Sequence, residues 1–373
     1  MTGNQWTNIF VIKVYSLYWY SPENAYTKIS LVEQFLFVLS TIVVIFGPLC
    51  YLLIMKELNF IQNVIMISQF SSGVIAWIIV IYIKYYTFEG VTEVYSMISK
   101  NWRVSLDNYH VSRALMICTR GFKCLALCCF IIAIIIFITI EFEECDLVLE
   151  PFSCGYILPS YYFVNLKRPF RDIVNACVAI SYVYICLPIV NALWALLLIM
   201  KYVEVTFNEM AQQLRELKFI SDWDIRNGQL IDLYNLQLFI TRLWNTFNDL
   251  YKLPISIHIF SCSSILSMSI ISTFMAFNIM AIVLICIFSG EIILFGLIGE
   301  KLSEINERYR NEIYFACPWD GDVKSSKHLM LMHLNSNDII MLKIGTSLKY
   351  SNTLVYKLFK LAYSMITMFS KQR

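Results

Sequence analysis

Long apolar runs separated by charged stretches divide this chain of 373 residues. The hydrocarbon core of a bilayer is about 30 Å thick, so a spanning helix needs about 20 consecutive apolar residues. The charge-free run 253–290 is too long for one span and fits two, with a turn within 272–278. The pattern predicts seven membrane-spanning helices, at 34–55, 58–83, 124–140, 173–200, in the two halves of 253–290 with the second half running on to Gly299, and at 351–370.

Amphipathic charged segments follow the fourth and sixth predicted spans, at 201–252 and 299–343. Their apolar residues recur at helical spacing, and such a face cannot be left bare in water. We therefore expect these segments to extend the fourth, fifth and sixth helices beyond the membrane and to pack together there. The stretch 322–343 should insert among them as a further helix. Within the first span, Gly47 and Pro48 predict a kink.

The composition agrees with a membrane protein. Hydrophobic residues make up 58% of the chain and charged residues 15%, whereas soluble domains have about 45–50% and about 25%. Membrane lipid is therefore the expected surrounding. The net charge is only +2, and no run of Lys and Arg interleaved with aromatic residues occurs, which argues against nucleic acid as a partner.

The distribution of the 29 lysines and arginines predicts the orientation of the chain. Most of them fall on the side of the N-terminus if seven spans are counted, and positive charge marks the cytosolic side. The N-terminus is therefore expected in the cytosol and the C-terminus outside. A G-protein-coupled receptor has the opposite orientation, and the chain lacks a D-R-Y triplet after the third span and N-P-x-x-Y in the seventh. That alternative stays disfavoured, and the absence of internal repeats argues against a secondary transporter.

The C-terminal quarter carries the most specific motif. It runs GEKLSEINERYRNEIYFACPWDGD, continues through a basic helix start to Gly345, and ends in SNTLVYKLFKLAYSMITMF. This stretch resembles the C-terminal signature of insect odorant receptors. The matching elements are Gly299-Glu300, Tyr314, Pro318-Trp319, Gly345 and Tyr363-Ser364.

Two departures place the chain within that superfamily. Gustatory receptors end the last helix differently, where this chain has Ala362-Tyr363-Ser364-Met365, so a gustatory-type receptor channel is the less favoured alternative. The shared co-receptor has a much longer segment between its fourth and fifth helices than residues 201–252 here. The chain therefore looks like a ligand-tuned odorant receptor subunit and not like the co-receptor.

The resemblance implies an all-α membrane protein that works as a ligand-gated, non-selective cation channel. It implies a heterotetramer with the odorant receptor co-receptor, a small apolar volatile odorant as ligand, and a multi-pass location in the plasma membrane of the sensory dendrite. Three parts follow: 1–300, with helices one to six, their cytosolic extensions and a ligand-binding bundle in the outer half of 58–300; 301–345, the cytosolic anchor helices; and 350–373, the pore-lining seventh helix.

The last helix can be tested for a pore face, because residues three and four apart share one side of a helix. Met368 lies about where the resemblance puts an apolar constriction, and an apolar ring can gate by dewetting. The alternative is packing against helices of the same subunit. Lys357 and Lys360 lie nearer the cytosol, where they border an aqueous vestibule or snorkel to the interface. The predicted pore residues are Leu361, Ser364, Met365 and Met368.

The odorant pocket is inferred from the outer halves of four spans. Its residues are mostly aromatic, methionine and aliphatic, which suits a small apolar ligand with about one hydrogen bond. Ordinary helix packing is the alternative for each residue. The predicted pocket residues are Met66, Gln69, Phe70 and Gly73 of the second span, Phe130, Ala133, Ile134 and Phe137 of the third, Ser181, Tyr182 and Ile185 of the fourth, and Phe277, Met280, Ala281 and Leu284 of the sixth.

Catalytic and metal-binding patterns were sought as well. The chain has no H-E-x-x-H, no nucleophile elbow, and His328 and His333 are five apart and do not share a helical face. We therefore expect no enzyme, no metal and no cofactor. Glu291 is expected to be an interfacial or paired acid. Cys145 and Cys154 share one polar loop, where a disulfide is possible if the loop is extracellular.

Overall fold

Helices make up almost all of the described part of the computed structural model. It describes residues 35–54, 70–71, 73–79, 81–82, 93–94, 97, 170–220, 222–275, 279–316, 323–336, 340–344 and 348–370. The predicted third span and the pair Cys145 and Cys154 lie outside these residues. The elements are η2 (Thr41–Phe46), α3 (Gly47–Ile54), α7 (Phe170–Glu216), η3 (Leu217–Phe219), α8 (Trp223–Met275), α9 (Ile279–Ala316), α10 (Val323–Asn335), β1 (Lys343–Ile344), β2 (Leu348–Lys349) and α11 (Asn352–Ser370).

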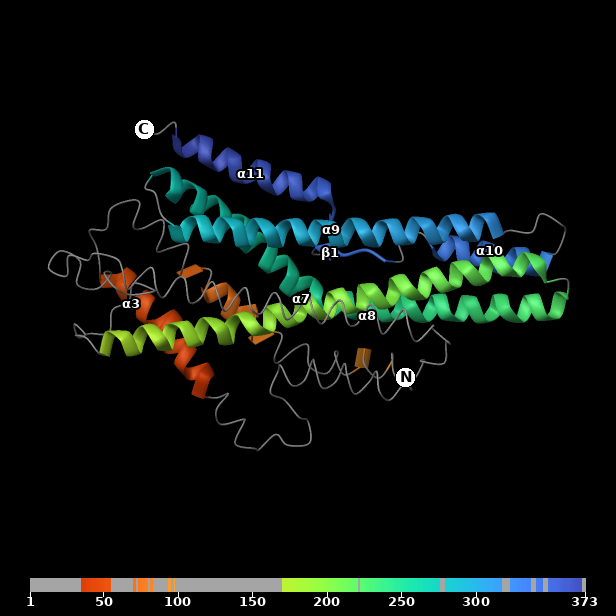
Figure 1. Ribbon diagram of the computed structural model, residues 1–373, viewed down its shortest axis with the longest axis horizontal. Coiled ribbons are helices and arrows are strands. Elements are labelled where there is room, and N and C mark those ends of the chain that lie inside the picture. The colour runs from red at the N-terminus through yellow and green to blue at the C-terminus, as the bar shows by residue number, and fades with distance from the viewer. Residues whose placement is uncertain are drawn as a thin grey trace.

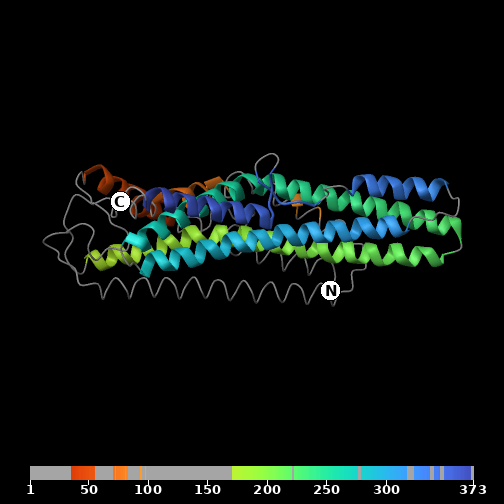
Figure 2. The ribbon, with the colours of Figure 1, turned by 90° about the horizontal axis from the view of Figure 1, so that it is seen from above.

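Three long helices, α7, α8 and α9, run lengthwise beside one another and form the body of the molecule (Figures 1 and 2). Each is one continuous helix over a predicted span and a charged segment beside it. That the charged parts extend beyond the membrane stays a prediction. Helix α8 ends at Met275 and α9 begins at Ile279. By length and composition, one helical segment of the described residues, Trp223–Ile271, is apolar enough to cross a membrane, and 67% of its most apolar stretch is buried within the chain.

The core lies where the extensions of these helices meet. Its largest fully buried side chains include Trp244 of α8, Phe207 of α7 and Tyr309 of α9. Phe207 and Tyr309 stack with their ring centroids 4.5 Å apart and so join α7 to α9. Burial raises the pKa of the Tyr309 phenol above its ordinary value, which keeps this ring neutral and suited to an apolar contact.

The turn between α7 and α8 is specified locally. The carboxylate Oδ1 of Asp222 accepts hydrogen bonds from the backbone N–H groups of Asp224 at 2.9 Å and Ile225 at 3.3 Å. These donors have no partner within the first turn of a helix, so Asp222 acts as the N-cap of α8. The same helix contains Pro254.

Several serines in the apolar half of α8 donate hydrogen bonds to their own helix. The hydroxyl groups of Ser261 and Ser267 donate to the carbonyl oxygens four residues earlier, at 2.6 Å and 2.8 Å. Such back-bonding lets a polar side chain lie in apolar surroundings without an unsatisfied donor. Serines that are bonded in this way are therefore compatible with a membrane-spanning helix, whereas the buried hydroxyl of Ser269 has no hydrogen-bond partner among the described residues.

The segment after α9 differs from the prediction. A helix was expected up to about Lys343, but α10 ends at Asn335. The hydroxyl of Ser336 donates to the carbonyl of His333 at 2.6 Å and closes the helix, as the turn-forming sequence Asn-Ser-Asn-Asp favours. A two-stranded antiparallel hairpin follows, in which Lys343 pairs with Lys349 and Ile344 with Leu348. Apart from this hairpin, the described residues agree with the expected all-α fold.

The first predicted span is helical over 35–54. The irregular part of this span lies just before the predicted kink at Gly47-Pro48. Residues Thr41–Phe46 form a π-helix, and Gly47 is its C-cap. The ring of Pro48 removes a backbone donor, and the π-helix lies just before it in the chain. Val43 of this stretch packs against Val178 of α7.

Candidate functional site at the start of helix α11

Helix α11 has one face inside the molecule and one outside. It packs against α8 and α9 (Figure 1), with Leu358 and Ala362 only 6% and 1% exposed. Tyr356, Leu361 and Tyr363 are more than half exposed on the same helix. An apolar face that is left exposed in a single chain indicates a contact with another molecule, such as a second subunit or lipid, or the wall of a channel or cavity.

The first turn of α11 is held by α9. The backbone N–H of Asn352 donates to Oε1 of Glu300 at 3.0 Å. This N–H has no partner within its own helix, and a carboxylate near a helix N-terminus is favoured by the helix dipole. Glu300 therefore fixes where α11 begins relative to the end of the sixth span.

Two glycines of α9 let α11 come close. A Cβ at Gly296 would lie 2.5 Å from Cγ2 of Val355, and one at Gly299 would lie 2.2 Å from the carbonyl oxygen of Tyr350. Any larger residue would push the start of α11 away from α9. The Gly299-Glu300 pair of the sequence motif thus has a physical role at this junction, which we call the α9–α11 junction and define by Gly296, Gly299, Glu300, Tyr350 and Asn352.

Tyr350 is the buried centre of the junction. Its phenol donates to the carbonyl oxygen of Ile292 at 3.2 Å, and its backbone N–H donates to the carbonyl of Leu342 at 2.9 Å. The ring of Phe295 meets it edge-on, with centroids 6.0 Å apart. Tyr350 therefore connects the hairpin to α9 immediately before α11 begins.

A polar row on α8 holds the segment from α10 to the hairpin. The side-chain amide of Gln237 donates to the carbonyl of Met332 at 3.0 Å, the indole N–H of Trp244 donates to the carbonyl of Met341 at 3.1 Å, and Oδ1 of Asn248 accepts from the N–H of Lys343 at 3.3 Å. These three residues are spaced by seven and four, so they lie on one face of the helix. These three residues were not predicted from the sequence, because polar residues of an amphipathic helix are usually exposed to solvent. Their spacing along one helical face was the signal that could have identified them.

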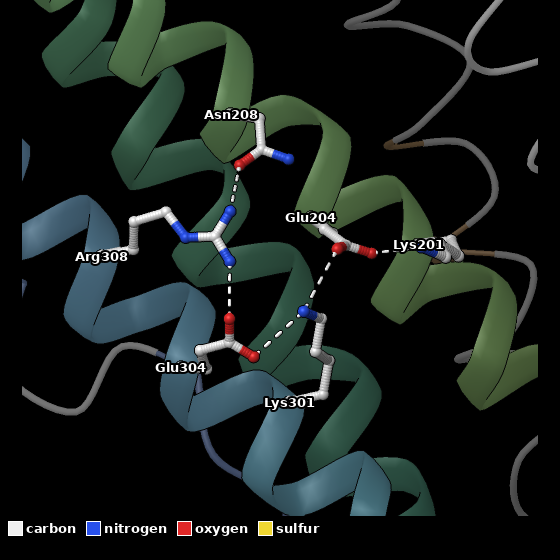
Figure 3. A network of polar contacts seen from close by, with 6 residues as sticks. All are labelled: Lys201, Glu204, Asn208, Lys301, Glu304 and Arg308. Carbon is white, nitrogen blue, oxygen red and sulfur yellow. Dashed lines mark hydrogen bonds and ion pairs between the residues drawn. The ribbon is translucent and has the colours of Figure 1, made fainter.

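An ionic network joins α7 to α9 beside this core (Figure 3). The ammonium of Lys301 lies 3.8 Å from Glu204 of α7 and 3.0 Å from Glu304, and Arg308 binds Glu304 at 2.8 Å. The hydrogen bond and charge of Lys301, followed by Arg308, lower the pKa of Glu304. Exposed ion pairs each contribute little to stability, so this network sets the register of two helices more than it stabilises them. Arg215 and Glu312 form a further ion pair between the same helices.

The predicted pore residues all lie on α11. Leu361 and Ser364 are exposed, and so are Lys357 and Lys360, which follow the same spacing of three and four along the helix. The hydroxyl of Ser364 donates to the carbonyl of Lys360 at 2.8 Å. Met365 and Met368 are within the helix, but their side chains are outside the described ones.

The predicted pocket is described only in part. Gly73 is buried, and a Cβ there would lie 2.7 Å from Cγ1 of Val44, so this position is a contact between the first two spans. Ser181 is buried and donates to the carbonyl of Cys177 at 2.7 Å. Phe70 and Leu284 are half-buried and Ala281 is buried, while Tyr182, Ile185 and Met280 lie within helices; Met66, Gln69, Phe130, Ala133, Ile134, Phe137 and Phe277 lie outside the described residues.

Glu291 lies in α9 and meets two residues of α8. Its Oε2 is 3.1 Å from Nε2 of His258 and accepts a hydrogen bond from the thiol of Cys262 at 3.4 Å. The expectation that this acid is paired is therefore confirmed. Its partners were not identified from the sequence, because they come from the preceding helix.

Comparison with solved structures supports the fold. The chain is similar to the insect olfactory receptor OR5 from Machilis hrabei in complex with eugenol, with a TM-score of 0.76 and 9% identity over 99% of this chain and 98% of that one. Another structure of OR5 from Machilis hrabei gives a TM-score of 0.71 and 9% identity over 95% and 92%. Among curated proteins, none matches the chain in sequence.

A family model decides the relationship. The model described as 7tm Odorant receptor matches residues 57–363, which is most of the chain. It includes the α9–α11 junction and all but the end of the predicted pore helix. This is a family of membrane receptors and channels, not of enzymes. The chain belongs to the 7tm odorant receptor family.

Proposed function

We propose that this chain is the odorant-binding subunit of a ligand-gated, non-selective cation channel, with α11 lining the pore. The observation that carries the proposal is the division of α11 into a buried face and an exposed one. Leu358 and Ala362 hold the helix to its own subunit, and Leu361 and Ser364 remain free to face a shared axis. A symmetric assembly would bring such faces of several subunits together.

The proposed ligand is a small apolar volatile bound in the outer half of the helix bundle. The solved OR5 structure contains eugenol, which makes this class of ligand reasonable for a relative of the same fold. In this chain the proposed pocket would bind the ligand mainly through dispersion and apolar burial. Ser181 or Tyr182 would form one hydrogen bond with it. Because the Ser181 hydroxyl already donates within its helix, it is better suited to accept than to donate.

The proposed coupling runs through the α9–α11 junction. Predicted pocket residues Ala281 and Leu284 lie on α9, and Gly299 and Glu300 at the other end of the apolar part of that helix hold the start of α11. A shift of α9 on ligand binding would therefore move α11. The proposed setting is a heterotetramer with the co-receptor in the plasma membrane of a sensory dendrite, with the N-terminus in the cytosol.

The test is a recording from cells that express the chain together with the co-receptor. We expect a fast odorant-evoked cation current that needs no added G-protein or nucleotide. Single cysteines placed at Leu361 and Ser364 should let a charged thiol reagent block that current. A cysteine at Tyr363, which is exposed on a different side of α11, is the matched control.

Two results would contradict the proposal. The first is the absence of current across a broad panel of volatiles when the protein is present at the cell surface. The second is equal block at positions 361, 363 and 364, since a pore face should discriminate among them. An epitope tag after Arg373 that stains intact cells would support the proposed orientation.

A further inference from the structure

Three side chains of different chemistry converge between α8 and α9. Nε2 of His258 and Sγ of Cys262 are 3.5 Å apart, and Oε2 of Glu291 lies 3.1 Å from the first and 3.4 Å from the second. His258 and Cys262 are four residues apart on α8, so they occupy one face of that helix. One potential ligand atom from each of the three residues lies within 4.8 Å of the other two. We propose that they form a binding site for a Zn²⁺-like transition-metal ion that bridges α8 and α9.

The spacing fits a tetrahedral ion. Zn²⁺ binds thiolate at about 2.3 Å and imidazole or carboxylate at about 2.0–2.2 Å, so the edges of a tetrahedral site are about 3.4–3.6 Å long. The three observed separations are 3.1, 3.4 and 3.5 Å. Three ligand atoms are thus already arranged as one face of the coordination tetrahedron, without any change of rotamer.

The chemistry of the ligands selects the metal. One thiolate, one imidazole and one carboxylate suit Zn²⁺ and similar borderline metals, whereas Mg²⁺ and Ca²⁺ prefer sites made of oxygen. Three protein ligands leave a fourth position for water or a small ligand. On binding, the thiol of Cys262 gives up to solvent the proton that now lies in a hydrogen bond to Glu291. Nε2 of His258 gives up the proton that it shares with Glu291, and the ring then carries its one proton on Nδ1.

The site is accessible from one side. The side chain of Glu291 is 30% exposed and that of His258 is 13% exposed, while Cys262 is buried. An ion would therefore meet the carboxylate first and the thiol last.

The site is also adjacent to the α9–α11 junction. Phe295, one turn after Glu291, meets the ring of His258 edge-on at 6.4 Å and the ring of Tyr350 at 6.0 Å. Tyr350 in turn donates to Ile292, the neighbour of Glu291. An ion that fixes α8 to α9 here stabilises the present arrangement of the junction, and its effect on current, unlike its binding, rests on the proposed channel function.

The experiment begins with purified full-length protein and Co²⁺ as the probe. Thiolate bound to Co²⁺ gives a charge-transfer absorption, which we expect in the parent protein and not in Cys262→Ser. His258→Asn and Glu291→Gln should each weaken Co²⁺ and Zn²⁺ binding at least about tenfold. Cys286→Ser, which removes an exposed free cysteine of α9, is the matched control and should keep the signal. Zn²⁺ should also raise the unfolding temperature of the parent and of Cys286→Ser, but not of Cys262→Ser.

The outcomes separate the site from its role. Equal Co²⁺ absorption in the parent and Cys262→Ser would overturn the site, and the cluster would then be a hydrogen-bonded contact alone. Zn²⁺ applied to the co-receptor complex should change the odorant-evoked current in the parent and not in Cys262→Ser. If Zn²⁺ binds the parent but changes the current equally in the parent and in Cys262→Ser, the proposed effect on gating is wrong, although the metal site itself is still supported.

Discussion

Gly299 and Tyr350 touch through their backbones. A Cβ built on Gly299 would lie 2.2 Å from the carbonyl oxygen and 2.9 Å from the carbonyl carbon of Tyr350. A backbone atom cannot turn away as the end of a side chain can, so the two segments approach as closely as glycine permits. This contact sets how near the start of α11 lies to α9, and it connects the sixth span to the proposed pore helix.

Gly299→Ala should therefore be costly. The added carbon must displace the backbone of Tyr350, two residues before α11, and overpacking of this kind destabilises by about 1–3 kcal/mol. We expect a lower unfolding temperature of the purified protein. In cells, we expect a reduced odorant-evoked current at equal surface amount. Displacing Tyr350 also moves Asn352, whose backbone N–H is held by Glu300 at the start of α11.

Gly290→Ala is the control on the same helix. No heavy atom of the described residues lies within 4 Å of a Cβ built there, and alanine is favoured over glycine in a helix interior by about 1 kcal/mol. This variant should be as stable as the parent or more stable. A loss similar to that of Gly299→Ala would mean that helix flexibility, and not the contact with Tyr350, explains the first result.

Gln237 joins three elements and should be sensitive to substitution. It is fully buried, donates to the carbonyl of Met332 of α10 at 3.0 Å and accepts from the phenol of Tyr309 at 3.5 Å. Gln237→Leu leaves a buried carbonyl without its donor, which costs about 1–3 kcal/mol. We expect a lower unfolding temperature and faster proteolysis between α9 and α11. Gln229→Leu, at an exposed position of the same helix, should change neither measurement.

The helices were predictable from the sequence to the extent that apolar length and helical spacing define them. Helix α8 ends at Met275 and α9 begins at Ile279, and α7 and α9 are each one continuous helix over a predicted span and the charged segment that follows it. The end of α10 at Asn335 was missed, although the sequence Asn-Ser-Asn-Asp that follows favours a turn, because the apolar residues after it keep a helical spacing into the hairpin.

The site was less predictable, for a physical reason. Gly299 and Glu300 were recognised only as parts of a motif. Their partners Tyr350 and Asn352 are about 50 residues later in the sequence, after α10 and the hairpin. His258 and Cys262 were not predicted to form a site, because they lie in a charge-free run and become a site only when Glu291 of the next helix lies beside them. Contacts between elements depend on the offset of one helix against another, which local pattern does not determine.

Glu209 makes the stability of the chain depend on pH. Desolvation raises the pKa of its carboxyl above the ordinary value of 4.5, and its Oε2 has no hydrogen-bond partner among the described residues. Above the folded-state pKa the chain must hold a desolvated carboxylate, whereas below pH 4.5 both folded and unfolded states are protonated. Glu209→Gln should therefore raise the unfolding temperature at pH 7, and the gain should vanish as pH falls through the folded-state pKa towards 4.5.

The control for this prediction is Glu216→Gln near the end of the same helix. Glu216 is exposed and accepts a hydrogen bond from the amide of Gln212 at 2.9 Å, so little is gained by neutralising it. Its effect on the unfolding temperature should be small at pH 7. A gain for Glu209→Gln that persists unchanged at low pH would show that the amide packs better, not that the charge was unfavourable.

Lys357 and Lys360 provide a test of the pore face itself. Both are exposed on α11, and Lys357 and Lys360 lie four residues before Leu361 and Ser364, respectively, so a pore lined by this face would carry their charges. In water, a cation passing at about 7 Å from one ammonium is repelled by about 0.6 kcal/mol, close to RT, which lowers its local concentration about two- to threefold. Lys357→Gln and Lys360→Gln should each raise single-channel cation conductance by roughly that factor, more at low salt than at high salt. Lys349→Gln, exposed in β2 and outside α11, should leave the conductance unchanged. Equal conductance in all four proteins would place these lysines away from the ion path, and with them the face of α11 that we assign to the pore.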